Sequence, residues 1–374
     1  MFRFAFLCIL TLLNFGCKEV LLTNPCDPNG SIFQNTVVTK FLLGDWSPTC
    51  NQTFSLSFPE MLEYNIPSLG VKGVITGNQI VLASENNSIG SYVAAFKTNA
   101  SSVFVDGIPQ ENNVTSNSYL SPLKYVLFGE GGASREYTVV LVAPRALGSG
   151  SLRIWLMADK LSLNDGAGVS VWNDQSGYAN HLEQSVLSQQ PIFRMNQVNG
   201  YPSLHFNDVS DSQLIKASGA LGLYGGNDSG SFFAVFKYYG GNPAGITLLN
   251  LQFQYGRELA FSTLEGFFVQ CVNGLACANI STLSAITPNY FSLASVQTLR
   301  TRIREYRNGV LVGDDTNPTN LYDLSGGSQP DSYFVSNGNM DGEIAEILYF
   351  HTDLSEDEIQ KVFFYLNTKY NLPK

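Results

Sequence analysis

Short runs that alternate apolar and polar residues, separated by turn residues, constrain the fold of this chain more than any other feature. Between Thr53 and Ala143 they include "GVKGVITGNQIVLA", "SYVAAFKT" and "SSVFVDG". A run in which every second residue is apolar buries one face of a β-strand. Several short strands at near-regular spacing therefore predict an all-β sandwich.

A second series of such runs extends from Leu152 to the end of the chain and includes "LRIWLMADKL" and "SFFAVFKYY". Between the two series lies "APRALGSGS" (143–151), which is rich in Pro, Gly and Ser and has no periodicity. A chain of 374 residues exceeds what one hydrophobic core usually serves. The sequence therefore predicts two β domains, over residues 53–145 and 146–374.

Composition supports two globular cores and excludes one class of function. The chain is 44% hydrophobic and only 14% charged, and its formal net charge is −10. Nucleic-acid binding requires a basic surface that displaces counterions from phosphates. General binding to nucleic acid is therefore not expected.

The C-terminus carries the signals of a helix. Ser355 and Glu358 have the spacing of a capping box. The residues that follow place an apolar stripe on one helical face: Ile359, Val362, Phe363 and Leu366. This helix should close one end of the second domain.

The N-terminal segment "MFRFAFLCILTLLNFGCKEV" has the features of an export signal. Its apolar run, residues 4–13, follows Arg3 and is too short to span a bilayer. The end at Gly16-Cys17 resembles the cleavage box of bacterial lipoproteins, in the looser form found in spirochaetes. This resemblance implies a signal peptide over 1–17, an acylated Cys17, and an anchor in the outer membrane or at the cell surface. The alternative is an ordinary cleaved signal with a chance cysteine.

Residues 18–52 are expected to form a tether with one structured segment. Phe33, Val37 and Phe41 recur at a helical spacing. Cys26 and Cys50 flank this stripe and would close it as a disulfide, as an oxidising compartment allows.

Two further cysteines, Cys271 and Cys277, occur in "QCVNGLAC". A two-residue Asn-Gly turn would direct them to opposite faces of a hairpin. A three-residue loop over 273–275 would place them opposite each other, within reach of a disulfide. We favour the second arrangement, because an exported protein seldom leaves two such cysteines unpaired. Pairings that link these cysteines to the tether remain formally possible.

The first β domain resembles the bacterial cadherin-like β-sandwich family. The resemblance lies in "GVITGNQIVL", "VFVDGIPQ" and "YVLFGEGGASREYTVVL". It implies an Ig/cadherin-like sandwich that acts as a spacer.

The second domain resembles the laminin-G-like, concanavalin-A-like jelly roll of bacterial surface proteins. The resemblance lies in the order of "LRIWLMADKL", "VSVWNDQSGYANHLEQ", "SFFAVFKYY", "RIREYRNGVLVG" and "DGEIAEILYF". It implies a domain that binds sugars, binds proteins or has a purely structural role.

Three carboxylates near the C-terminus, Asp341, Glu343 and Glu346, raise the question of catalysis. A retaining glycosidase needs two carboxyl groups about 5 Å apart on one side of a cleft. On a regular strand, Glu343 and Glu346 point to opposite faces, so a β-bulge at residues 344–345 would be needed. Catalytic relatives of the resembled fold carry E-x-D-x-x-E, whereas this chain has D-x-E-x-x-E. We favour a structural role for Glu346 and no enzymatic activity, with a glycan hydrolase as the alternative.

The resemblance also suggests a calcium ion at a loop between strands, since jelly rolls of this kind often hold one. Oxygen ligands suit such a hard cation. Candidate ligands occur in two loops, "NDQSGYAN" and "FNDVSD": Asp174, Ser176, Asn180, Asp208 and Asp211. The competing interpretation is that Asp174 and Ser176 brace a tight turn.

One basic cluster, "LRTRIREYRNG", stands out in an acidic chain. Period-two alternation places its candidate ligand-binding residues on one strand face: Arg300, Arg302, Arg304 and Tyr306. Such a face could bind sulfated glycans. Alternatively, it is a solvated face that is paired with acidic residues of a neighbouring strand.

Together these features predict an exported, lipid-anchored surface lipoprotein with a spacer sandwich and a distal jelly roll. We expect the jelly roll to act in adhesion, by binding a glycan or a host matrix protein. A glycan hydrolase and a purely structural envelope lipoprotein are the alternatives. No cofactor other than calcium is expected.

Overall fold

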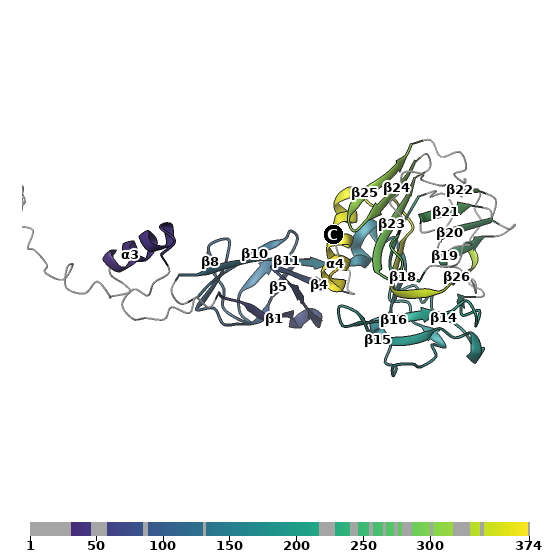
Figure 1. Cartoon of the computed structure of the whole chain (residues 1–374), viewed down its shortest axis with the longest axis horizontal. Helices are drawn as coiled ribbons and strands as arrows, with labels where there is room; N and C mark the ends of the chain where they lie inside the picture. Colours follow the sequence, from purple (N-terminus) through teal and green to yellow (C-terminus); the bar gives the residue numbers. More distant parts are fainter. Residues whose placement is uncertain are drawn as a thin grey trace, which may run out of the picture. The chain divides into compact units, whose positions relative to one another are not determined.

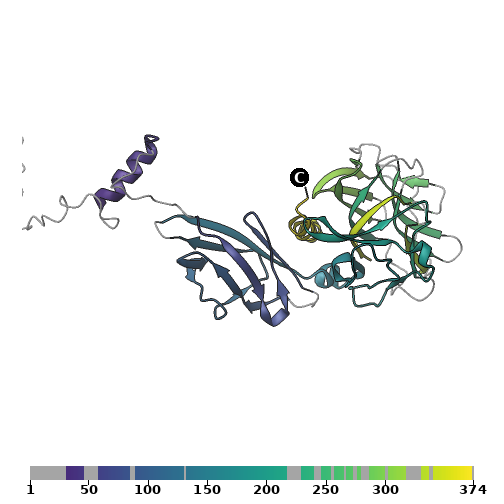
Figure 2. The same cartoon turned by 60° about the horizontal axis from the view of Figure 1, so that its bottom comes forward.

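A computed structural model of the chain gives the fold (Figures 1 and 2). It describes residues 31–45, 58–84, 89–129, 132–216, 229–239, 246–253, 257–264, 267–272, 276–278, 286–299, 302–316, 330–336 and 340–372. Contacts divide the chain into two units, Met1–Phe58 and Pro59–Lys374.

In the first unit, helix α3 spans Ser31–Leu42 and confirms the predicted helix, but its apolar stripe is not buried along its length. Phe33 is buried, whereas Val37 and Phe41 are exposed. Cys26 and Cys50 lie outside the described residues, so their disulfide stays a prediction. No helix in the described part of the chain is long and apolar enough to cross a membrane.

The second unit begins with a sandwich of short strands. A six-stranded sheet has the order β3-β4-β11-β10-β7-β8, and faces a three-stranded sheet of order β2-β1-β6, while β5 and β9 form a separate pair. Tyr64, Tyr125 and Tyr137 fill its core. The strands are β1 (Met61–Ile66), β2 (Val71–Lys72), β3 (Val74–Thr76), β4 (Gln79–Ala83), β5 (Ser91–Val93), β6 (Ala95–Thr98), β7 (Ser102–Val105), β8 (Ile108–Pro109), β9 (Ser116–Ser118), β10 (Leu123–Phe128) and β11 (Ser134–Val142).

A short 3-10 segment, η2 (Pro144–Ser149), follows β11 and contains the predicted domain boundary. The second sandwich then begins with β12 (Leu152–Met157) and η3 (Ala158–Lys160). One sheet has the order β15-β16-β27-β18-β23-β24-β25, with β12 also paired to β27, and the other has the order β13-β14-β17-β26-β19-β20-β21-β22.

The remaining elements of this sandwich are β13 (Val171–Trp172), β14 (Leu182–Glu183), η4 (Leu187–Gln189), β15 (Ile192–Val198), β16 (Tyr201–Phe206), β17 (Leu214–Lys216), β18 (Gly230–Tyr238), β19 (Ile246–Phe253), β20 (Arg257–Leu264), β21 (Phe267–Val272), β22 (Ala276–Ala278), β23 (Phe291–Leu299), β24 (Arg302–Arg307), β25 (Val310–Asp315), β26 (Pro330–Val335), β27 (Gly342–Phe350) and α4 (Glu356–Tyr370). The all-β class and the C-terminal helix are therefore as predicted.

Two apolar layers cover the two faces of the β27 sheet. The inner layer lies between the sheets and includes Ile344 and Ile347. The outer layer includes Ala345 and Leu348 of β27 and the buried stripe of α4. Every residue of β27 is buried, because this central strand is covered on both faces.

The capping box that begins α4 is present as predicted. The Glu358 backbone N–H donates to Ser355 Oγ, and the Ser355 N–H donates to a Glu358 carboxylate oxygen at 2.9 Å. The same glutamate also accepts a bond from the Gly148 N–H, which ties the helix start to η2.

The β21–β22 hairpin places Cys271 directly opposite Cys277 and Val272 opposite Ala276. This register is the one expected for a three-residue connection over 273–275. The two cysteine side chains lie outside the described residues, and the disulfide stays a prediction.

Candidate functional site

A β-bulge in β27 changes where its two glutamates point. Glu346 is opposite Val235 of β18, but Ile344 is opposite Phe236, so Ala345 is the extra residue. The bulge reverses the alternation, and Glu343 and Glu346 share the outer face of the sheet. The prediction of opposite faces for a regular strand therefore does not hold.

Glu346 lies at the centre of a closed hydrogen-bond network beneath α4. One carboxylate oxygen accepts bonds from Trp155 Nε1 at 2.7 Å and Tyr365 Oη at 2.8 Å. The other accepts from Lys369 Nζ at 2.9 Å and Tyr370 Oη at 2.8 Å. The side chain is fully buried, so the network leaves Glu346 without access to a substrate.

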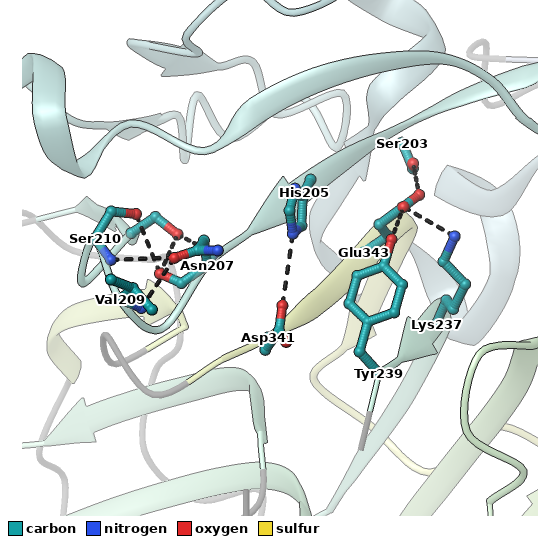
Figure 3. Close-up of polar contacts among 10 residues, drawn as sticks. Ser203, His205, Asn207, Val209, Ser210, Lys237, Tyr239, Asp341 and Glu343 are labelled. Atoms are coloured by element: carbon teal, nitrogen blue, oxygen red, sulfur yellow. Dashed lines mark hydrogen bonds and ion pairs between the residues drawn. The ribbon is translucent and has the colours of Figure 1, made fainter. Parts of the chain in front are cut away.

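Glu343 forms a second, separate network (Figure 3). Ser203 Oγ donates to one oxygen at 2.5 Å, while Lys237 Nζ at 2.9 Å and Tyr239 Oη donate to the other. Burial alone would raise the pKa of the Glu343 carboxyl, but these donors lower it below its usual value. Glu343 is thus held as an anion that orients its neighbours.

Asp341 lies beside this network rather than within it (Figure 3). Its carboxylate is 3.6 Å from His205 Nε2, and the His205 ring lies edge-on to Tyr239, with 5.6 Å between ring centroids. The three carboxylates are thus distributed over distinct environments, and both oxygens of each glutamate are engaged.

Asp174 binds its own loop, which we call the 173–180 loop. Its carboxylate accepts bonds from the Trp155, Ser176 and Asn180 backbone N–H groups at 2.8–2.9 Å. It also accepts a bond from Ser176 Oγ at 2.5 Å. These contacts are those expected for the turn-bracing interpretation.

Asp208 belongs to a different turn, in which the Asn207 side-chain oxygen accepts bonds from the Val209 and Ser210 N–H groups (Figure 3). Asp211 follows at a positive φ of 50°. Among the described residues, no group of three or more His, Cys, Asp or Glu side chains is arranged to hold a metal ion. The proposed calcium ligands are therefore not assembled as such a group.

On β24, Arg302 and Arg304 share the face of Tyr306 as predicted, while Arg300 lies outside the described residues. Arg302 forms a bidentate ion pair with Asp314 of β25, and this pair holds the pKa of the Asp314 carboxyl below its usual value. Tyr306 is buried and donates to Glu356 of α4 at 2.8 Å. The neighbouring strand thus supplies an acidic partner, and α4 covers the aromatic end of the face.

The structure contains a pocket that sequence motifs did not indicate. It has a volume of about 690 Å³ and lies where η2, the start of β12, the end of β27 and the start of α4 meet. We call it the β12–α4 pocket, and it is lined by Gly148, Ser149, Ser151, Arg153, His351, Thr352, Asp353, Leu354, Ser355 and Glu358.

Arg153 enters this pocket because of a second bulge. Leu152 is opposite Phe350 and Ile154 is opposite Tyr349, so Arg153 is the extra residue of β12. Its guanidinium carbon lies 4.3 Å from the centroid of the Tyr178 ring, which is 45% exposed. Ser176 Oγ and Asn180 Nδ2 donate to the Arg153 carbonyl, so the 173–180 loop fixes this stack.

Two residues at or near the pocket have a strained backbone conformation. Most non-glycine residues with positive φ in the described chain are Asn or Asp, which tolerate this region. The exceptions in the described chain are Ser149, which lines the pocket, Ala179, next to Tyr178, and Ser336, which follows β26; their φ values are 54°, 54° and 59°. Glycine is required at position 148, because the Cβ atom of any other residue would lie 2.4 Å from Ser151 Oγ. Strained backbone of this kind often marks a functional site.

No protein-family model and no curated protein matches the sequence. Among solved structures, the chain is similar to domain 4 of an extracellular arabinanase from Geobacillus stearothermophilus, solved in complex with arabinotriose. The two are 12% identical in sequence, the match covers 57% of this chain and 98% of that chain, and the TM-score is 0.39. A Trypanosoma rangeli sialidase shows 9% identity over 79% of this chain and 49% of its own, with a TM-score of 0.40.

The binding domain of botulinum neurotoxin serotype G is similar at 12% identity over 58% of this chain and 51% of that chain, with a TM-score of 0.41. This chain thus spans about half of the sialidase and toxin chains. Because these TM-scores are below 0.5, the residues of this chain must carry the argument for its function.

Proposed function

We propose that the second sandwich is a carbohydrate-binding domain whose ligand occupies the β12–α4 pocket. We further propose that the protein carries this domain as a lipid-anchored lipoprotein of the bacterial cell surface, with Cys17 acylated. The observation that carries the first proposal is a polar pocket whose lining includes an arginine, Arg153, that is stacked on a partly exposed tyrosine, Tyr178.

The pocket has the chemistry that a sugar requires. A pyranose presents several hydroxyl groups, each of which loses water on binding and needs a new donor or acceptor. Most of the lining residues supply such groups through hydroxyl, carboxylate, imidazole or guanidinium side chains. The volume of about 690 Å³ lies within the range of roughly 300–1,000 Å³ that is usual for small-ligand pockets.

The Arg153–Tyr178 stack supplies rigidity and an apolar surface. Stacking restricts the guanidinium, so less conformational entropy is lost when its N–H groups bind ligand oxygens. The exposed part of the Tyr178 ring can contact the C–H face of a sugar. Arg145 donates to the Gln175 carbonyl and further fixes the loop that carries Tyr178.

Binding without hydrolysis is the activity that we propose. Glu343 and Glu346 are the carboxylates on the same face of β27, but their oxygens are already bound by protein donors. General acid catalysis requires a carboxyl group that can reach the glycosidic oxygen. The two networks therefore support a binding domain more than a hydrolase.

The full-length chain, purified in detergent, should be screened on a glycan array and titrated with the best ligand. Arg153→Gln should weaken binding by about 10- to 100-fold, since a charge-assisted hydrogen bond contributes about 1.5–3 kcal/mol. Arg135→Gln is the matched control, because Arg135 also stacks on a tyrosine, Tyr137, at 5.1 Å but lies in the first sandwich.

Unchanged affinity in a folded Arg153→Gln protein, or no glycan bound by the native chain, would refute the proposed site. Metabolic labelling with a radioactive fatty acid tests the anchor separately. Label should enter the native chain and be absent from Cys17→Ala.

A further inference from the structure

The network around Glu346 contains a second feature, which is independent of the proposed pocket. Lys369 Nζ, in the last turn of α4, contacts two carboxylates at once. It is 2.9 Å from Glu346 Oε2 and 3.0 Å from Oδ1 of Asp159, which lies in η3. The Lys369 and Glu346 side chains are at most 5% exposed, and that of Asp159 is 21% exposed.

We propose that Lys369 and Asp159 form an intramolecular amide cross-link, with Glu346 as the proton-transfer group. Each reacting group lies within hydrogen-bonding distance of the lysine nitrogen. Cγ of Asp159, the atom that the amine would attack, is bonded to the oxygen that lies 3.0 Å from Nζ. Holding two reacting groups side by side in this way gives an intramolecular reaction its advantage. The three side chains come from three elements, so the fold must assemble before the bond can form.

The proton and atom balance of the step closes without another reactant. Lys369 begins as an ammonium with three protons, and Asp159 and Glu346 begin as carboxylates. Glu346 takes one proton from Nζ and passes it to an Asp159 oxygen, and the neutral amine attacks Cγ of the resulting carboxylic acid. Glu346, again a carboxylate, then takes a second proton from the nitrogen and passes it to the same Asp159 oxygen. One Asp159 oxygen departs as water with both protons, the third proton stays on the amide nitrogen, and Glu346 is a carboxylate again.

The surroundings favour this condensation in two ways. The Nζ atom lies 5.0–5.7 Å from the ring centroids of Tyr201, Tyr365 and Tyr370, so the site is largely enclosed by aromatic rings. Condensation removes the charges of Lys369 and Asp159, and with them the desolvation cost of that buried ion pair, while three neutral donors remain for the Glu346 carboxylate. Trp155 Nε1 and the two tyrosine hydroxyls of α4 hold Glu346 in position throughout.

The resting state is nevertheless the ammonium. Burial lowers the pKa of Lys369, but Glu346 and Asp159 raise it by more, to above its usual value. Proton transfer to Glu346 must therefore precede attack, and the bond should form slowly after folding. The linked residues are 210 positions apart, so the bond would join the end of α4 to the beginning of the second sandwich.

Mass spectrometry of the full-length chain tests the proposal. After reduction, alkylation and proteolysis, the protein incubated in its folded state should give one branched peptide that contains Asp159 and Lys369. Its mass should be about 18 Da below the sum of the two separate peptides, because one water is lost. Fragmentation must place the bond between the two side chains, since an aspartyl succinimide also loses one water.

Lys369→Arg keeps the cation and should abolish the branched peptide while the protein remains folded. Glu346→Gln keeps the shape of the side chain but cannot accept the proton, and should also abolish it. Lys361→Arg, on the exposed side of α4, is the matched control and should leave the branched peptide in place. Unlinked Asp159 and Lys369 peptides from a folded, incubated native chain would overturn the proposal.

Discussion

Glu305 should make the stability of the second sandwich fall as the pH rises. It lies on β24 two residues after Ile303, which belongs to the inner core, so its side chain also points between the sheets. One carboxylate oxygen is 3.3 Å from Arg307 Nε, and the other is buried without a hydrogen-bond partner in the described part of the chain. Burial raises its pKa from 4.5 to about 7, although Arg307 opposes this shift.

The direction of this pH dependence follows from whether the folded or the unfolded state binds the Glu305 proton more tightly. Between pH 4.5 and about 7 the folded protein keeps the Glu305 proton, whereas the unfolded chain has lost it. The contribution of Glu305 to stability is thus fully present below its pKa in the unfolded chain, and it is lost as the pH rises through its pKa in the folded protein. A shift from 4.5 to about 7 corresponds to about 3 kcal/mol.

Urea unfolding of native and Glu305→Gln proteins at pH 5 and pH 8 measures this effect. The fluorescence of Trp155 and Trp172 reports on the second sandwich, because both are buried in it. The free energy of unfolding of Glu305→Gln relative to the native chain should rise by about 2.5 kcal/mol from pH 5 to pH 8, because the unfolded chain has already lost part of the proton at pH 5. Glu136→Gln removes an exposed glutamate paired with Lys124 and should show almost no such change. Parallel pH profiles for Glu305→Gln and the native chain would refute the reasoning.

Three other predictions use the same unfolding assay or thermal melting. Ser355→Ala removes the capping box of α4 and should cost about 1 kcal/mol, whereas Ser210→Ala in an exposed turn should cost less; equal costs would contradict the role of the cap. Tyr370→Phe deletes one hydrogen bond to the buried Glu346 carboxylate and should destabilise the protein by about 1.5–3 kcal/mol; a neutral effect would show that the network tolerates the loss. Chelator should leave the melting temperature unchanged, because protein donors already bind both oxygens of Asp174; a fall that calcium reverses would restore the calcium hypothesis.

Local signals in the sequence predicted local structure well. The Ser355–Glu358 spacing and the apolar stripe after it defined α4, because a helix start and its buried face depend on residues three or four apart. The hairpin at Cys271 and Cys277 is different, because the local Asn-Gly signal indicated a two-residue turn. The observed register, with the two cysteines opposite each other, was favoured only because an exported protein seldom leaves such cysteines unpaired.

The β12–α4 pocket could not be predicted in this way. Its lining comes from residues 148–153 and 351–358, which lie far apart in sequence and carry no shared motif. Arg153 points into it because of a bulge that depends on pairing with β27. A single arginine in an apolar run gives no indication of such a bulge, although the positive φ at Gly148 and Ser149 is consistent with the turn residues that end "APRALGSGS".

The bulge at Ala345 shows why strand alternation alone cannot assign a catalytic role. It provides the shared face that two catalytic carboxylates need, yet it also brings Glu346 beneath α4, where Trp155, Tyr365, Tyr370 and Lys369 bind it. Glu346 is fully buried there, and each of its oxygens already accepts two hydrogen bonds, so neither can reach the glycosidic oxygen of a bound sugar. Hydrolysis would therefore require α4 to leave the sheet and expose its buried apolar stripe to water. That cost argues that α4 and Glu346 stabilise the sandwich, and it is consistent with the proposal that a ligand binds in the β12–α4 pocket rather than at Glu346.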